Sequence, residues 1–324
     1  MQIEMAPMEG ITNYIYRQVF ANHFGAVDRY YTPFISPNQT ESLQSKEWKE
    51  LLPENNRGLH VIPQLLTKNA DHFLWAAHQA ARLGYREVNY NIGCPSGTVV
   101  AKGKGSGMLR DLDHLDETLE KIFQSCPVAV SVKTRIGIAD PAEFGKILEI
   151  YNRYPIVRLI IHPRVQKEFY KGSVHGEIFA LAYEKAKMPV IFNGNLAKTD
   201  DVDWLMEDFP RLKGVMLGRG MLSNPALAEQ VVRVPGAVLT MDRFRSFHSD
   251  LIRWNSEVLS GDHQVLHRMK EFWPYWYINF TNGQKYWKAV RKAKKLADYL
   301  TALEQLYSSE EIIPGAAFED YSIR

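Results

Sequence analysis

Cysteine is scarce in this chain. Cys94 and Cys126 are the only two among 324 residues, too few for a disulfide scaffold and not spaced as a CxxC metal or redox pair. The sequence also lacks an HExxH motif and any cluster of cysteine with histidine, so we expect no metal site. Any chemistry at Cys94 is therefore that of a free thiol, whereas Cys126, just before a predicted strand, is expected to be a buried packing residue.

Long apolar runs are missing as well. Nowhere do eighteen apolar residues follow one another, and no basic segment leads into an apolar stretch at the amino terminus. Hydrophobic residues make up 45% of the chain and charged residues 23%, as in globular proteins. We therefore expect a cytoplasmic, monomeric protein of about two domains without membrane contact. The net charge of +2 only slightly favours a nucleic-acid partner.

Two common nucleotide-binding motifs are absent, although glycine is frequent between residues 97 and 107. Five residues separate Gly97 from Gly103, and no Ser or Thr follows Lys104, so the P-loop pattern fails. The dinucleotide-binding fingerprint fails because Met108 stands where its last glycine is required. These absences exclude the two best-known glycine-rich phosphate loops.

A repeating unit organises the first two thirds of the chain: a short apolar run, then polar residues, then a segment of helical periodicity. The eight predicted strands are 3–6, 28–32, 60–65, 87–91, 128–133, 158–162, 190–193 and 214–217. Helices are predicted between them, for example at 69–83 and 112–124. Alternating strands and helices imply a parallel sheet, and eight units predict a (β/α)8 TIM barrel. An open doubly wound sheet is the alternative.

The alternation stops after Pro235 and Gly236, and the remaining sequence has helical periodicity. We therefore predict a barrel domain over residues 1–237 and a helical domain over residues 238–324.

Polar side chains follow the predicted strands, where a TIM barrel carries its active site. They include Gln64, Asn91, Cys94, Lys133, Arg135, His162 and Arg164, and then the runs Asn193-Gly-Asn195 and Gly218-Arg-Gly220. The two runs follow the last two strands, where barrels often bind a phosphate through backbone N–H groups. Either run alone is more often a turn or a surface cation, but together they favour a phosphate site.

Cys94 lies directly after the predicted strand 87–91, on a loop that continues into a glycine-rich run at 102–107. We interpret these glycines as allowing the loop to move. A single cysteine is more often a small buried apolar residue. Its place at a strand end makes Cys94 a candidate catalytic thiol instead.

Several separate motifs follow one another along the chain: Ala6-Pro-Met-Glu-Gly10, Gln64-Leu65, Asn91-Ile-Gly-Cys-Pro95, Ser131-Val-Lys-Thr-Arg-Ile-Gly137, His162-x-Arg164, Asn193-Gly194, Gly218-Arg-Gly220 and His267-Arg-Met-Lys-Glu-Phe-Trp273. Together they resemble one family, the tRNA dihydrouridine synthases, which are flavin enzymes that reduce a uracil ring in tRNA. The motifs occur in the family's order and cover most of the chain, which is far more specific than any single motif.

The resemblance implies a bound FMN. Pro7 and Met8 would lie under the flavin ring, and Gln64, Lys133 and His162 would face its polar edge, where a cation near N1 stabilises the reduced form. The phosphate would lie on the residues of the two glycine-containing runs, Asn193, Gly194, Asn195, Gly218 and Arg219. The alternatives are that Lys133 is an ion-pair partner and His162 a hydrogen-bonded core residue.

The resemblance also implies a reaction. We predict hydride transfer from the reduced flavin to C6 of a uracil in the tRNA D-loop, with NADPH as reductant and Cys94 protonating C5. An unperturbed thiol has a pKa of about 8.5 and is mostly protonated near neutrality. Asn91 would bind the uracil edge, and Arg164 would hold the base or its phosphate.

A uracil stacked within tRNA must swing out to reach a flavin, so we expect a second surface that binds RNA. Lys285, Lys288, Lys292 and Lys295 have the spacing of one helix face, and Lys288 and Lys292 are the predicted RNA contacts. Lys102 and Lys104 are predicted to contact the same substrate. The ordinary alternative is a solvated helix face. The aromatic run 272–280 is expected to pack a small core rather than to stack on bases.

The chain departs from the family pattern at Pro163, where glycine is common, and at Asn195, where an acidic residue is common. The opening motif is similar to that of the bacterial subgroup acting at an early D-loop position. Two alternatives stay open: an FMN barrel oxidoreductase of a small molecule such as a pyrimidine or an enone, and a tRNA-binding protein without turnover.

Overall fold

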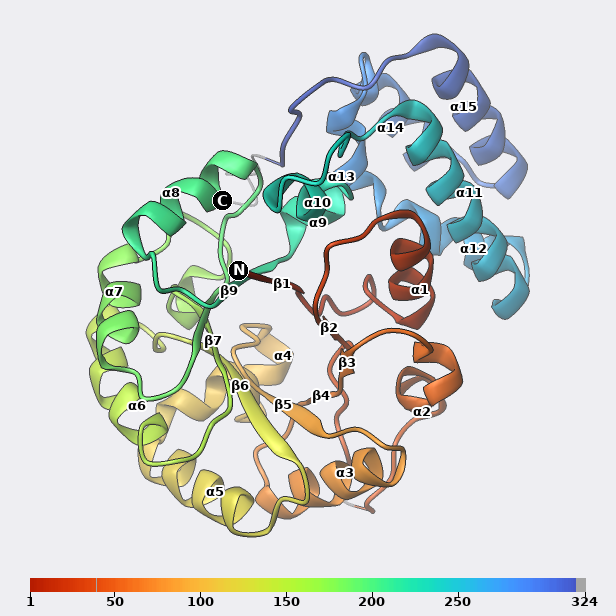
Figure 1. The fold of residues 1–324 in the computed structure, drawn as a ribbon. Helices are drawn as coiled ribbons and strands as arrows, with labels where there is room; N and C mark the ends of the chain where they lie inside the picture. Colours follow the sequence, from red (N-terminus) through yellow and green to blue (C-terminus); the bar gives the residue numbers. More distant parts are fainter. Residues whose placement is uncertain (39, 319–324) are drawn as a thin grey trace.

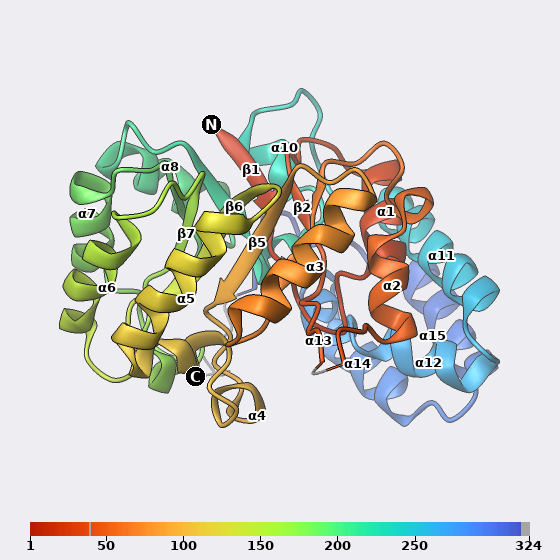
Figure 2. The ribbon, with the colours of Figure 1, turned by 90° about the horizontal axis from the view of Figure 1, so that it is seen from below.

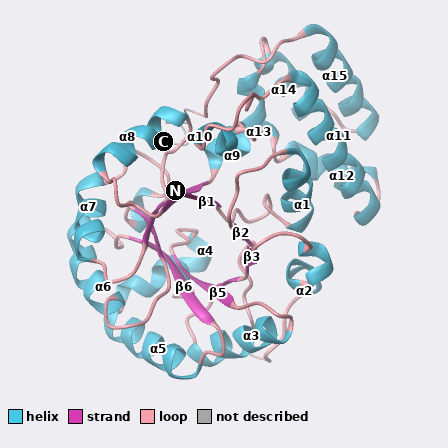
Figure 3. Ribbon diagram, viewed as in Figure 1, coloured by secondary structure: helices cyan, strands magenta, loops and turns pink. Residues whose placement is uncertain are grey.

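The computed structural model describes residues 1–38 and 40–318, so residues 319–324 of the predicted helical domain lie outside the described residues. Short strands form a central barrel, and helices surround it (Figures 1 and 3). A further group of helices, late in the sequence, packs beside one side of the barrel (Figure 1).

The paired strands are parallel. They are β1 (Gln2–Met5), β2 (Tyr30–Tyr31), β3 (Val61–Ile62), β4 (Gln64–Leu65), β5 (Glu87–Ile92), β6 (Ala129–Arg135), β7 (Leu159–His162), β8 (Val190–Phe192) and β9 (Gly214–Leu217). Seven form one sheet in the order β1-β9-β8-β7-β6-β5-β4, and β2 pairs with β3. The eight predicted strands are confirmed to within two residues at each end, with one of them divided.

The divided strand is 60–65, and Pro63 divides it. Proline has no N–H to donate to a neighbouring strand, so β3 pairs with β2 while β4 pairs with β5. The ring then closes between β2 and β1, where the Met5 N–H donates to the Arg29 carbonyl over 2.9 Å. Because the strand order is cyclic, the architecture is the predicted (β/α)8 barrel and not an open sheet.

Helices connect the strands and cover the barrel (Figure 3). They are α1 (Tyr14–His23), α2 (Ser45–Leu51), α3 (Ala70–Arg82), α4 (Gly97–Val100), α5 (Leu112–Ser125), α6 (Phe144–Tyr151), α7 (Gly176–Lys185), α8 (Thr199–Asp208), α9 (Arg219–Ser223) and α10 (Leu227–Val231). The later group comprises α11 (Met241–Val258), α12 (Asp262–Lys270), α13 (Trp273–Trp276), α14 (Gly283–Lys292) and α15 (Leu296–Ser309). Within the described part of the chain, no helix has the length and hydropathy that crossing a membrane requires.

The ends of α3 show how local sequence sets a helix. The Asn69 side chain accepts hydrogen bonds from the N–H groups of Asp71 and His72, which lack partners in the first turn. After Leu83, Gly84 has a φ of +90°, a conformation that glycine adopts at little cost and that ends the helix. The predicted helix 69–83 is therefore confirmed, with its first and last residues serving as caps.

The late helices share a continuous apolar core with the outer layer of the barrel. The aromatic run 272–280 supplies much of it, since Phe272, Trp273 and Trp276 are buried and in ring contact with one another or with neighbouring aromatics. Trp276 also donates its indole N–H to the Leu222 carbonyl over 3.0 Å. The expected packing role of this run is confirmed, and it fixes the late helices to the barrel.

Charged groups fill the amino-terminal end of the barrel. Glu4 is fully buried, forms an ion pair with Arg158 at 3.0 Å and accepts a hydrogen bond from the Tyr31 hydroxyl at 2.8 Å. Arg158 also contacts Glu87 at 2.5 Å. Burial raises the pKa of the Glu4 carboxyl, while Arg158 and Tyr31 oppose that rise. The charge of Glu4 is thus compensated mainly by one guanidinium.

Replacing Arg158 with methionine should destabilise the protein by about 3–5 kcal/mol, because Glu4 would remain buried without its main partner. Urea unfolding followed by circular dichroism measures this. The exposed pair of Lys121 with Asp71 provides the control, and Lys121→Met should cost less than about 1 kcal/mol. Similar losses in the two variants would contradict the argument.

Candidate active site

A cavity of about 720 Å³ opens at the carboxyl ends of the strands, within the range of roughly 300–1,000 Å³ typical of cofactor sites. Every residue predicted to bind cofactor lines this cavity, as do Asn91 and Cys94. The predicted residues in its wall are Pro7, Met8, Gln64, Asn91, Cys94, Lys133, His162, Asn193, Gly194, Asn195, Gly218 and Arg219. The fold therefore brings together side chains from widely separated parts of the sequence.

Asn91 fixes the backbone that carries Cys94. Its side-chain oxygen accepts from the N–H of Gly93 at 3.0 Å and from that of Cys94 at 2.9 Å. Its amide nitrogen donates to Gln64 at 2.7 Å, and Gln64 donates in turn to Asn89 at 2.8 Å. This chain of amides lies across β4 and β5, so it holds the Cys94 loop to the barrel.

The glycine-rich run after Cys94 is folded rather than irregular. Residues 105–109 are buried, and Ser106 donates from its N–H and its hydroxyl to the Cys94 carbonyl. Gly105 has a φ of +57°, and a Cβ there would come within 2.8 Å of the Cys94 carbonyl oxygen. The glycines therefore allow close packing against Cys94, and the expected movement of the loop stays a prediction.

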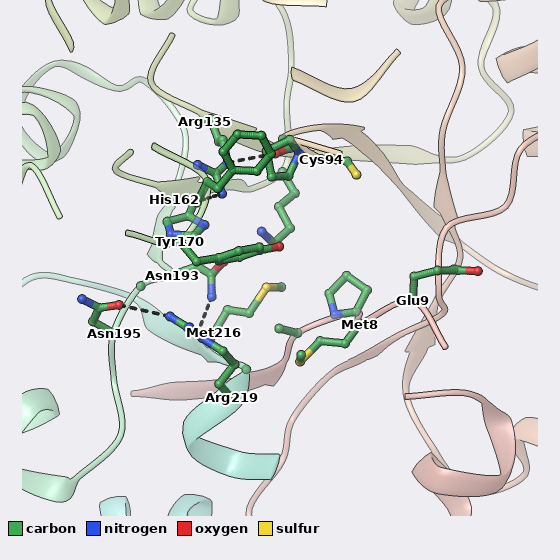
Figure 4. A pocket seen from close by; sticks show the side chains of 18 of the residues that line it. Met8, Glu9, Cys94, Arg135, His162, Tyr170, Asn193, Asn195, Met216 and Arg219 are labelled. Atoms are coloured by element: carbon green, nitrogen blue, oxygen red, sulfur yellow. Dashed lines mark hydrogen bonds between the residues drawn. The ribbon is translucent and has the colours of Figure 1, made fainter. Parts of the chain in front are cut away.

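The Cys94 thiol is partly buried at the cavity wall. Burial raises its pKa above the ordinary value, and the opposing effects of a backbone hydrogen bond, Lys133 and Arg135 are smaller. The sulfur is consequently a neutral S–H near pH 7 and can donate a proton. In Figure 4, Cys94 lies across the open space from Met8 and Met216.

His162 is held in one tautomer by Arg164. The Arg164 guanidinium, 2.9 Å from Nε2 of His162, can only donate, so Nε2 accepts and Nδ1 carries the proton. Burial, and then Arg135, Lys133 and other cations, lower the pKa of His162 well below its usual range. Within residues 1–38 and 40–318, no acceptor lies within hydrogen-bond distance of Nδ1–H, which leaves this donor for a ligand.

Arg164 itself lies behind the cavity wall. It is fully buried and also donates to the side-chain oxygen of Asn195 at 3.0 Å and to the carbonyl of Lys171 at 3.1 Å. Arg164 therefore contacts His162 and Asn195 and does not line the cavity. The predicted contact of Arg164 with the substrate would have to be made in that cavity.

Lys133 projects into the cavity from β6. Burial, and then Arg135, lower its pKa to about 7. No acceptor within the described residues is in hydrogen-bond distance of its ammonium, so the ion-pair alternative is not what the structure shows. A half-buried cation without a hydrogen-bond partner favours an anionic or strongly polar ligand beside it.

The two glycine-containing runs form one end of the cavity. A Cβ at Gly220 would lie 2.2 Å from the Leu196 carbonyl oxygen, so only glycine lets the two loops meet. Arg219 approaches the Asn195 oxygen at 3.5 Å, as drawn in Figure 4, and its buried Nη1 has no hydrogen-bond partner. This unpartnered donor is what a bound phosphate would satisfy.

Several lining residues were not assigned by the sequence analysis. Arg135 lies two residues after Lys133 on β6, so the two side chains share one face of the strand. This spacing of two residues could have identified Arg135 as a cavity residue. Tyr170 lies over both Arg135 and Arg219, with its ring centre 5.3 and 5.2 Å from their guanidinium carbons. Met216, Glu9, Tyr275 and Phe318 also line the cavity. Met216 lies on β9 and Tyr275 on α13, and only the tertiary structure brings these four residues to one cavity.

The predicted RNA contacts lie outside the cavity. Lys102 is exposed near its mouth, and Lys104 donates to the Ser36 hydroxyl at 2.7 Å. Lys288 and Lys292 are exposed on α14, which lies toward the same end of the molecule as α4 (Figure 2). The predicted single helix face is wrong at Lys295, because α14 ends at Lys292 and Lys295 precedes α15.

Two solved structures have a similar fold. The structure resembles morphinone reductase in complex with tetrahydroNAD, with a TM-score of 0.53 and 13% identity over 74% of this chain and 87% of that one. It also resembles histamine dehydrogenase from Rhizobium sp. 4-9, with a TM-score of 0.53 and 10% identity over 84% of this chain and 49% of that one. At these identities the likeness concerns the barrel fold alone.

Comparison of sequences identifies relatives more specifically than comparison of folds does. The tRNA-dihydrouridine(16) synthase of Pseudomonas putida is 29% identical over 245 residues, 71% of this chain and 73% of that protein. The tRNA-dihydrouridine synthase B of Pasteurella multocida is 27% identical over 227 residues, 70% of this chain and 67% of that protein. The family profile of dihydrouridine synthase (Dus) matches residues 4–320. Because that match spans nearly the whole chain, the protein is an enzyme of the dihydrouridine synthase family.

Proposed function

We propose that this enzyme is an FMN-dependent tRNA-dihydrouridine synthase, which reduces the C5=C6 bond of a D-loop uridine in tRNA with electrons from NADPH. The observation that carries the proposal is the neutral Cys94 thiol in the wall of a cavity that Lys133, His162 and Arg219 also line, with the buried Nη1 of Arg219 unpartnered. The names of the relatives in Pseudomonas and Pasteurella supply the tRNA substrate.

The cavity residues fit FMN in three separate respects. Lys133 and the Nδ1–H of His162 offer donors without an acceptor to the electron-rich edge of a flavin ring. Pro7, Met8 and Met216 offer an apolar surface for the ring. Arg219, with its unpartnered buried Nη1, suits the phosphate. When bound, reduced FMN would supply a hydride to C6 of the uracil, and NADPH would reduce it again.

Cys94 provides the proton that completes the reduction. As hydride adds at C6, negative charge develops at C5 and the adjoining carbonyl, and a proton from Sγ–H forms the new C5–H bond. Asn91 holds the Cys94 backbone in place through two hydrogen bonds, so the thiol is positioned before the base arrives. Asn91 has a further N–H for the uracil edge, because only one of its two amide hydrogens goes to Gln64.

The barrel and the late helices divide the substrate between them in this proposal. Residues 1–237 bind the flavin and the extruded uridine, and residues beyond 237 bind the body of the tRNA. Barrel lysines would add to the RNA contact: burial lowers the pKa of Lys104, and the nearby charges of Lys102 and Lys68 lower it further. Closely spaced lysines of this kind are stabilised by phosphate oxygens.

Incubation of unmodified tRNA with the enzyme, FMN and NADPH should yield dihydrouridine, detected by nucleoside mass spectrometry and located by sequencing. Cys94→Ala should lower the single-turnover rate at least about a hundredfold, because the general acid is lost. Cys126→Ala is the matched control and should react like wild type. An unchanged rate in Cys94→Ala would remove the acid role. No dihydrouridine from any tRNA, with reduction of a free pyrimidine or enone, would favour the small-molecule alternative.

Lys133→Met should stabilise the flavin-free enzyme while abolishing tight flavin binding. The folded protein lowers the pKa of Lys133 to about 7, against about 10.4 in an unfolded chain. Between these values the unfolded chain binds more protons, so the free energy of unfolding of wild type rises with pH. The variant should exceed wild type by roughly 1–3 kcal/mol below pH 7, and the difference should shrink toward pH 10.

Urea unfolding of flavin-free wild type and Lys133→Met at several pH values checks this, with exposed Lys121→Met as the control. A stability difference that does not depend on pH would contradict the assigned cause.

Charge reversal at Lys288 and Lys292 should weaken tRNA binding and lower the dependence of affinity on salt, with the slope of log K against log salt falling by about two. Filter binding over a salt series measures this, and flavin content should not change. Lys185→Glu with Lys187→Glu is the control, because these exposed lysines precede β8 at the opposite end of the barrel. Equal effects of the two double variants would count against an RNA surface on α14.

A further inference from the structure

The chain returns from the late helices to the barrel mouth in an extended segment, residues 310–318, which we call the C-terminal strap (Figure 1). Ile312 pairs antiparallel with Phe280, and the Ile313 N–H donates to the Asn279 carbonyl at 2.8 Å. Asn279 in turn donates its side-chain N–H to the carbonyl of Ser223, the last residue of α9, at 2.7 Å. The strap is therefore fixed to a segment that is itself fixed to the barrel.

The strap places Phe318 in the wall of the cavity, next to Tyr275 from α13. The two ring centres are 5.3 Å apart. The Phe318 ring also lies over Arg219, with its centre 5.3 Å from the guanidinium carbon. Because Tyr170 lies 5.2 Å from the same carbon, two aromatic rings from distant parts of the sequence contact one guanidinium.

Contact with two rings restricts where the Arg219 side chain can point and reduces its hydration. Its Nη1 is buried without a partner, and its Nη2 approaches only Asn195, at 3.5 Å. The guanidinium is thus oriented by stacking, while its hydrogen-bonding groups stay available. A side chain ordered in advance loses less conformational entropy when an anion binds.

We propose that Phe318 is a positioning residue, which orients Arg219 for the phosphate group of the flavin and makes the C-terminal strap part of the cofactor site. This inference rests on the proposed use of FMN. We assign its effect to the phosphate and not to the flavin ring, because the side chains that the Phe318 ring contacts in the cavity wall are Arg219 and Tyr275. The late helices then contribute to cofactor retention as well as to RNA binding.

The test compares FMN with riboflavin, which has the same ring and no phosphate. Dissociation constants for both flavins are measured by fluorescence quenching on wild type, Phe318→Leu and Phe318→Tyr. Phe318→Leu should weaken FMN binding about three- to tenfold and leave riboflavin binding unchanged, and Phe318→Tyr should restore FMN binding because it keeps the ring. Ile313→Ala, on an exposed side chain of the same strap, should leave both constants unchanged.

The variant Arg219→Ala extends the test. In its background, Phe318→Leu should have no further effect on FMN binding, because the group that Phe318 orients is gone. If Phe318→Leu weakens the binding of FMN and of riboflavin equally, or weakens neither, the inference is overturned and the proposed function is unaffected. Failure of wild type to bind either flavin would overturn both.

Discussion

An excess of buried positive charge at one end of the barrel constrains the rest of the site. Lys133, Arg135, Arg164 and Arg219 surround His162, and none of the four forms an ion pair with a carboxylate in the described part of the chain. Uncompensated cations are costly in a partly dry cavity. The protein tolerates them through carbonyl acceptors, aromatic rings and a neutral imidazole, and an anionic ligand would remove the remaining cost.

At the opposite end of the barrel, buried charge is compensated by ion pairs. There Glu4 and Glu87 form ion pairs with Arg158. A closed barrel thus has one end whose buried charges form ion pairs with one another, and one end whose cations do not. This asymmetry is consistent with the general location of TIM-barrel active sites at the carboxyl ends of the strands.

The thiol and the cations also depend on each other. Cys94 stays protonated because burial outweighs the nearby charges of Lys133 and Arg135, which would otherwise favour a thiolate. A more open cavity would lower the pKa of this thiol, so a smaller fraction of it would carry the proton near neutrality. The packed glycine run, with Gly105 against the Cys94 carbonyl, therefore matters for proton donation as well as for loop shape.

The sequence by itself determined the eight strands, the caps of α3 and the set of polar residues at the strand ends, because strand periodicity and capping depend on neighbours within a few residues. It could not determine that Pro63 divides one strand between two partners, that Arg164 lies behind His162, or that α14 ends at Lys292. Nor could it bring Phe318 and Tyr170 to Arg219. Those contacts join residues far apart in the chain, and only the closed barrel and the returning strap decide which side chains meet.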